Sequence, residues 1–171
     1  TLDPRGGAYI GVGPEQNFSY IARLQPTLAF IVDIRQDNRD LHLMYKALFE
    51  LAADRVEFVS RLFSREQPAG LERTTSADDL FAAFDEIRPS EGLLNQTSKL
   101  IQEHLLQAHR FPLTSEDLNS IHQTLTEFHH HGPDIRYGRS LPSSEMRPSY
   151  RRLMTGRDHR GVPRSYLASE R

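Results

Sequence analysis

The chain has 171 residues, 37% of them hydrophobic, which is enough for one domain with a hydrophobic core. Its formal net charge of −2 argues against a general nucleic-acid binder, which carries a basic face. It contains no cysteine, so disulfides and thiolate metal sites are excluded. No apolar run reaches the roughly 20 residues that span a bilayer, and residues 1–5 lack the apolar core of a signal peptide. We therefore expect a cytoplasmic protein with no membrane partner.

The first part of the chain predicts a β-α-β unit. A strand over residues 8–10 ends in the turn GVGP at residues 11–14, and proline suits the first helical position because an N–H has no partner there. Apolar residues at helical spacing predict a helix over residues 15–24. The continuous apolar run LAFIV at residues 28–32 predicts a second strand, buried on both faces.

Asp33 ends this second strand, twenty positions after Gly13. In nucleotide-binding folds, glycines let the backbone approach a ligand and the helix N-terminus offers free N–H groups. A carboxylate at the tip of the next strand accepts hydrogen bonds from ribose hydroxyls. The order strand, Gly11-x-Gly13, helix and strand ending in Asp33 therefore predicts a site for a nucleoside.

The turn departs from the pattern of cofactors that contain a pyrophosphate. The third glycine is missing at both Glu15 and Gln16, and Glu15 places a negative charge where a diphosphate would lie. Arg35 suggests, as an alternative, contact with the 2′-phosphate of NADP, but Glu15 and Asp33 oppose it. S-adenosylmethionine has an adenosine but no phosphate, so it tolerates the acidic turn.

Residues 10–18, IGVGPEQNF, and residues 30–35, FIVDIR, resemble the first two motifs of class I S-adenosylmethionine-dependent methyltransferases. More closely, they resemble a bacterial group of methyltransferase-like proteins with no established reaction. The methyltransferase resemblance covers about residues 8–35 and implies an α/β fold with a Rossmann-like start and S-adenosylmethionine as cofactor. It implies a cofactor-binding site formed by Gly11, Val12, Gly13, Asn17, Asp33, Ile34 and Arg35.

Methyl transfer needs mainly the positioning of a nucleophile, so it leaves little local sequence signature. The methyl acceptor, a small molecule or a macromolecule, and the catalytic residues are therefore undefined. A second hypothesis is a non-catalytic scaffold or interaction protein that retains the fold without the cofactor. The missing third glycine favours it, and side chains would then fill the space above Gly11 and Gly13.

An apolar stripe with steps of three and four residues predicts one long helix over residues 36–64, packed on the sheet. Asp37 or Asn38 is its expected N-terminal cap. Oppositely charged residues four apart are expected to pair on its exposed side: Lys46 with Glu50, and Glu57 with Arg61.

Three further helices are expected, at residues 76–87, 93–108 and 114–128, and they form a large α-helical insertion or subdomain. Such an addition can cover the cofactor, shape the substrate site or form a dimer contact. The predicted parts of the chain are a Rossmann-like cofactor-binding βαβα portion (residues 1–65), the helical insertion (66–131) and an irregular basic segment (132–171).

The irregular segment contains one expected short helix, at residues 150–155. Its basic and aromatic composition can serve an anionic substrate or nucleic acid, but salt bridges to acidic helices or to a partner chain are the favoured interpretation. Nucleic acid is therefore not expected as a partner. The residues concerned include Arg136, Tyr137, Arg139, Arg147, Tyr150, Arg151, Arg157, His159 and Arg164.

A group of polar residues around residue 130 invites a metal hypothesis. His122 and His129 share a helix face but stand about two turns apart, too far to bind one ion together. His130 and Asp134 meet only if the helix end bends. Histidines here, His131 included, complement the negative end of the helix dipole, so we expect no metal.

Only two strands can be predicted, and two parallel strands do not make a stable sheet. We therefore expect the native protein to continue with further strands, or the chain to pair edge to edge with another as a homo-oligomer.

Overall fold

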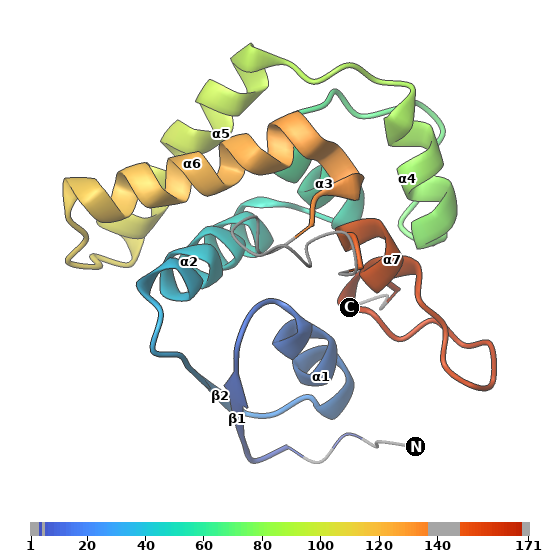
Figure 1. Ribbon diagram of the computed structural model, residues 1–171, viewed down its shortest axis with the longest axis horizontal. Helices are drawn as coiled ribbons and strands as arrows, with labels where there is room; N and C mark the ends of the chain where they lie inside the picture. Colours follow the sequence, from blue (N-terminus) through green and yellow to red (C-terminus); the bar gives the residue numbers. More distant parts are fainter. Residues whose placement is uncertain (1–3, 5, 137–147, 169–171) are drawn as a thin grey trace.

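The computed structural model describes residues 4, 6–136 and 148–168 (Figure 1). It is a mixed α/β structure in which helices predominate, with one two-stranded parallel sheet. Among the described residues, none of the helices has both the length and the apolar composition that crossing a membrane requires. The elements are β1 (Ala8–Val12), α1 (Gln16–Leu24), β2 (Leu28–Val32), α2 (Gln36–Leu51), α3 (Arg55–Phe63), α4 (Ala77–Asp85), α5 (Glu91–Glu103), a π-helical turn (His104–Ala108), α6 (Ser115–His131) and α7 (Tyr150–Thr155).

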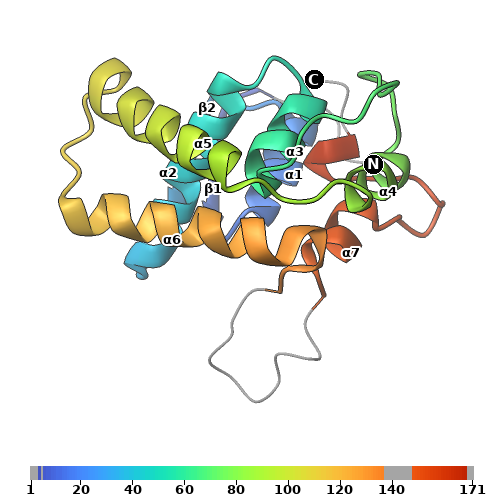
Figure 2. The same ribbon diagram turned by 90° about the horizontal axis from the view of Figure 1, so that it is seen from above.

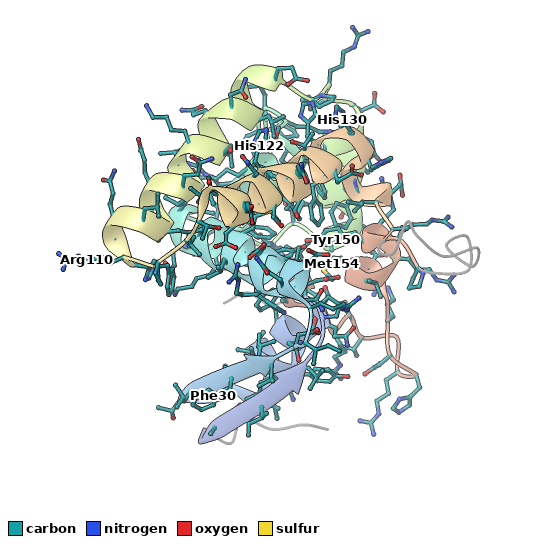
Figure 3. The ribbon with its side chains drawn as sticks, turned by 60° about the vertical axis from the view of Figure 1, so that its left-hand side comes forward. Phe30, Arg110, His122, His130, Tyr150 and Met154 are labelled. Carbon is teal, nitrogen blue, oxygen red and sulfur yellow. The ribbon has the colours of Figure 1, made fainter. Side chains whose placement is uncertain are left out.

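The two predicted strands and the helix between them are present. β1, however, runs to Val12, two residues into the predicted turn, and α1 begins at Gln16, so Pro14 is not the first helical residue. β1 and β2 are parallel, with Val12 opposite Val32 at their carboxyl ends. The prediction that β2 is buried on both faces is wrong. Side chains alternate between the faces of a strand, and within the described residues one face of the sheet is left uncovered. Its apolar side chains are 51–73% exposed: Ile10, Val12, Leu28, Phe30 and Val32. Figure 3 shows Phe30 far from the helical layer.

The prediction of a single helix over residues 36–64 is wrong, because the chain breaks between α2 and α3. Asp54 is the N-cap of α3, and its Oδ1 accepts hydrogen bonds from the backbone N–H groups of Val56 and Glu57 at 2.9 and 3.0 Å. Glu57 in turn accepts a hydrogen bond from the N–H of Ala53 at 2.8 Å. The two expected charge pairs are present, Lys46 with Glu50 and Glu57 with Arg61, each at 2.5 Å.

One hydrophobic core unites the helices with the later part of the chain. Tyr45 of α2, Phe63 of α3 and Phe128 of α6 are fully buried, and Tyr150 of α7 joins them. Figure 2 shows α6 running along one side of this helical layer, with α7 near its carboxyl end. Phe18 of α1 packs on the same cluster and holds the β-α-β unit against the helices.

The short helix expected at residues 150–155 is confirmed as α7. Several arginines of the basic segment pair with acidic residues of the same chain, as favoured from the sequence. Arg151 contacts Asp85 and Asp134, and other pairs join Arg157 to Asp78 and Arg164 to Asp158. The expected contributions of Tyr137, Arg139 and Arg147 lie outside the described residues. The C-terminal turn Tyr166–Ala168 returns to α1, where the backbone N–H of Tyr166 donates to Ser19 Oγ at 3.1 Å.

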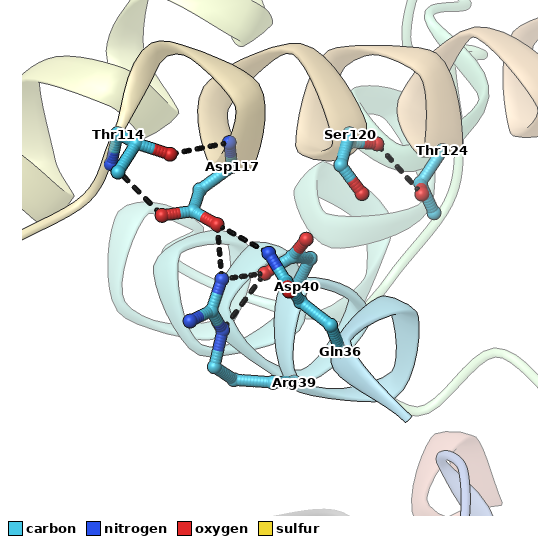
Figure 4. Close-up of polar contacts among 7 residues, drawn as sticks. All are labelled: Gln36, Arg39, Asp40, Thr114, Asp117, Ser120 and Thr124. Atoms are coloured by element: carbon cyan, nitrogen blue, oxygen red, sulfur yellow. Dashed lines mark hydrogen bonds and ion pairs between the residues drawn. The ribbon is translucent and has the colours of Figure 1, made fainter. Parts of the chain in front are cut away.

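A polar network joins α2 to the N-terminus of α6 (Figure 4). Arg39 of α2 donates to Asp40 and forms an ion pair with Asp117, which also accepts from Gln36 at 2.8 Å. Asp117 completes the cap of α6, because it accepts from the backbone N–H of Thr114 at 2.8 Å. This backbone bond and then the bond from Arg39 lower the pKa of Asp117 to about 2, although burial opposes the change.

We expect Asp117→Asn to destabilise the protein near neutral pH. Because the pKa of Asp117 is lowered on folding, its stabilising contribution is complete above its ordinary pKa of 3.8 and is lost as pH falls towards about 2. Urea unfolding should therefore show a stability difference between wild type and Asp117→Asn that is largest near pH 6 and narrows between pH 4 and pH 2. Glu116→Gln removes the same charge from an exposed neighbouring position and is the control. A difference that does not vary with pH would contradict the network's role.

Candidate functional site

The parallel pairing brings the glycine turn and the acidic strand end to one edge of the sheet. Since Val12 lies opposite Val32, Gly13 and Asp33 leave the sheet side by side. Gly13 has φ of +90°, which a glycine adopts without strain. Gly13 is buried, and the nearest atom to a Cβ built on it would be Nε2 of the Gln16 side chain, at an ordinary contact distance of 3.8 Å.

The space above Gly11, by contrast, is filled by the protein itself. A Cβ at Gly11 would lie 2.1 Å from Asn17 Oδ1 and 2.7 Å from the Tyr9 ring. No Cβ tolerates such distances, so glycine is required here to admit the Asn17 side chain. The structure thus gives Gly11 a packing role within β1, next to the turn.

Asn17 fastens the turn to α1. Its side chain is buried, its Nδ2 donates to the carbonyls of Gly13 and Pro14 at 3.0 and 2.8 Å, and its Oδ1 accepts from Tyr9 Oη at 2.8 Å. A longer contact of 3.3 Å reaches the carbonyl of Val12. A buried carbonyl without a partner is costly, so Asn17 stabilises a turn that the sheet alone does not satisfy.

Two residues of α2 that were not among the predicted site residues also contact the turn and Asp33. His42 Nε2 lies 2.8 Å from the carbonyl oxygen of Gly13, and because a carbonyl only accepts, this nitrogen carries the hydrogen. Asn38, four residues earlier, donates to Asp33 Oδ2 at 2.6 Å. Positions four apart share a helix face, so this spacing was the available signal that α2 presents both residues to the turn.

Asp33 is held in place by its own chain. Its Oδ1 accepts from the backbone N–H of Arg35 at 2.9 Å, and the Arg35 guanidinium lies 3.6 Å away. The Arg35 backbone bond and then the Asn38 bond lower the pKa of Asp33. Asp37 or Asn38 was expected to cap α2, and this is wrong: the N-cap position is Arg35, and the carboxylate that binds its N–H comes from Asp33.

The remaining predicted residues lie at the edges of the site. Val12 and Ile34 are 68% and 102% exposed, and the Arg35 side chain is also largely exposed. Of the seven residues predicted, the structure therefore brings together Gly13, Asn17 and Asp33, with Arg35 beside Asp33.

A cleft of about 660 Å³ begins next to the turn. One wall is α1, from Glu15 and Gln16 along to Tyr20, and the other is the C-terminal segment, including Arg152 and Met154. The sequence could not indicate this cleft, because its walls come from residues more than a hundred positions apart.

The histidines of α6 do not all meet at one point, although the rings of His129 and His130 lie 5.0 Å apart. His122 contacts Ser98 Oγ at 2.9 Å, His129 lies 3.3 Å from Glu91, and His131 lies 3.4 Å from Glu127. Figure 3 shows His122 and His130 at different places along the helix.

The chain belongs to the family described as Domain of unknown function (DUF7790), whose model matches residues 1–111. No curated protein and no solved structure matches the chain. The family match includes the glycine turn, Asp33 and both residues that α2 presents to them.

We expect Gly11→Ala to destabilise the protein by about 1–3 kcal/mol, the cost of displacing Asn17 and leaving buried carbonyls without donors. Asn17→Ala should have a similar effect, and the double variant should cost less than the sum because both act on one contact. Gly92→Ala in α5, where a Cβ meets only Ser90 Oγ at 3.5 Å, is the control and should be neutral or slightly stabilising. Additive effects in urea unfolding would contradict the coupling of Gly11 to Asn17.

Proposed function

We propose that the chain is a methyltransferase-like protein that binds S-adenosylmethionine at the carboxyl ends of β1 and β2. The observation that carries the proposal is the placement of Gly13 and Asp33 side by side at the start of α1. Parallel strands bind nucleotides at this edge, where a helix N-terminus and a strand-end carboxylate meet. On this proposal the β-α-β unit is a Rossmann-like start.

The residues present fit a nucleoside without a diphosphate. A carboxylate has about four lone-pair positions. Within the described residues, Asp33 uses one hydrogen bond on each oxygen, besides the weaker Arg35 contact. Acceptor capacity for a ribose diol therefore remains. At Gly13 a built Cβ meets only the flexible Gln16 side chain, whose movement would allow close approach, whereas Asn17 prevents it at Gly11. Glu15 lies two residues after Gly13, and its negative charge disfavours a diphosphate there.

The cleft beside α1 is the place where we propose that the methyl acceptor binds. It shares Glu15 and Gln16 with the end of the turn, so a molecule in the cleft lies next to the proposed cofactor site. The acceptor's identity is not part of the proposal.

The second candidate is a scaffold or interaction protein that keeps this fold without a cofactor. Asn17 favours it, because its side chain fills the space above Gly11 and uses the turn's carbonyls. His42 also donates a hydrogen bond to the Gly13 carbonyl. The two candidates differ in whether the remaining space at Gly13 accepts a ligand.

Calorimetric titration of the chain with S-adenosylmethionine tests the first candidate. We expect saturable binding of one molecule per chain, weakened roughly ten- to hundredfold by Asp33→Asn because a charge-assisted hydrogen bond is lost. Asp37→Asn removes the same charge from an exposed position on α2 and should bind like wild type. NADP should bind more weakly than S-adenosylmethionine.

Each outcome separates the candidates. If the folded wild-type chain shows no binding, the scaffold candidate is supported and the cofactor proposal fails. If binding occurs but Asp33→Asn and Asp37→Asn affect it equally, the ligand does not use the strand-end carboxylate and the site is placed wrongly.

A further inference from the structure

Two histidines and a glutamate from separate parts of the chain meet on one oxygen atom. Glu50 lies in the last turn of α2, and its Oε2 is 2.7 Å from His104 Nε2 and 2.5 Å from His109 Nε2. The other carboxylate oxygen, Oε1, accepts from Lys46 Nζ at 2.5 Å. Both imidazoles thus direct the same ring nitrogen at one carboxylate.

The backbone is irregular where it presents these histidines. Residues His104–Ala108 form a π-helical turn, closed by a bond from the N–H of His109 to the carbonyl of His104 at 3.2 Å. In an α-helix, residues five apart point about 140° away from each other. A π-turn brings them to the same side. Such turns are rare in proteins overall, and those that occur are often at functional sites. The two rings lie 5.0 Å apart.

His109 is also held by the Phe111 ring, which stacks on its imidazole. Arg110, labelled in Figure 3, has φ of 55°, a left-handed conformation that is uncommon outside glycine. This bend lets the Phe111 ring stack on His109 with 5.3 Å between ring centres. The side chains of His104 and His109 are 22% and 28% exposed, so they are packed but reachable from solvent.

We propose that Glu50, His104 and His109 bind a zinc ion, a function independent of the proposed cofactor site. Two imidazoles and one carboxylate are a ligand set that zinc uses, with a fourth position left for water. The three ligand atoms lie within 4.8 Å of one another. An ion about 2.0–2.2 Å from each ligand requires ligand atoms about 3.3 Å apart. Each histidine nitrogen therefore needs to move less than 1 Å further from Glu50 Oε2 than in its hydrogen-bonded position.

Lys46 is the feature that opposes a cation, and its geometry is compatible with one. Its ammonium binds Oε1, whereas the histidines converge on Oε2. The carboxylate can therefore bridge Lys46 and the ion. Repulsion between the Lys46 ammonium and the zinc ion nevertheless lowers the affinity for zinc. Replacing Lys46 therefore changes zinc binding without removing a ligand.

Titration of the chain, prepared without a histidine tag, with zinc alone tests the proposal. We expect one ion per chain and a rise in melting temperature on binding. Glu50→Gln and His109→Gln should each weaken binding by about 100-fold or more, since second-shell changes alone cost 10–100-fold. Lys46→Met keeps all three ligands and should bind zinc at least as tightly as wild type.

The control is a variant of the other histidine group, His130→Gln with His131→Gln, which should leave zinc binding unchanged. Cobalt in place of zinc should give the visible absorption of a tetrahedral site, and this absorption should be lost in His109→Gln. The proposal is overturned if wild type binds no zinc in the micromolar range, if the α6 variant abolishes binding, or if folded Glu50→Gln and His109→Gln, checked by circular dichroism, bind like wild type. Loss of binding in Lys46→Met would also overturn it.

Discussion

The packing of Phe18 against the aromatic core is the interaction on which the arrangement of the molecule depends. The Phe18 ring lies 5.3 Å from Tyr45, 5.1 Å from Phe49 and 5.8 Å from Tyr166, measured between ring centres. A two-stranded sheet has little stability of its own, so the β-α-β unit needs this attachment to the helical core. The next residue towards the N-terminus, Asn17, binds the turn carbonyls. One turn of α1 therefore fixes both the position of the unit and the shape of the candidate site.

Local patterns in the sequence were sufficient for much of the fold. The strands, α1 and α7 follow from short local patterns bounded by glycine, proline and capping residues, and they lie within two residues of where they were expected. The break after α2 was missed because the apolar stripe continues across it. The signal was nevertheless present, because Asp54 with Glu57 three residues later has the pattern of a capping box. In the structure Asp54 caps α3, and Glu57 accepts from the N–H of Ala53, one residue before the cap.

The candidate site was only partly predictable, for a physical reason. The spacing of Gly13 and Asp33 is a property of one β-α-β unit, so it can be read locally. The contacts that Asn38 and His42 make depend on the rotation of α2 about its axis, which is set by the core. The pairing of His104 with His109 could not be predicted from the sequence. Their spacing of five residues places them on different faces of a regular helix, and only the π-turn brings them together.

Helix α2 connects the two sites that we propose. His42 reaches the glycine turn near its start and Glu50 meets the two histidines at its end, and these positions are about 12 Å apart at 1.5 Å per residue. Between them Tyr45 and Leu48 are fully buried, so this part of the helix is fixed by the core. Neither site uses a ligand of the other. An ion at Glu50 would therefore restrain the end of α2 without occupying the turn, and the loss of one site need not remove the other.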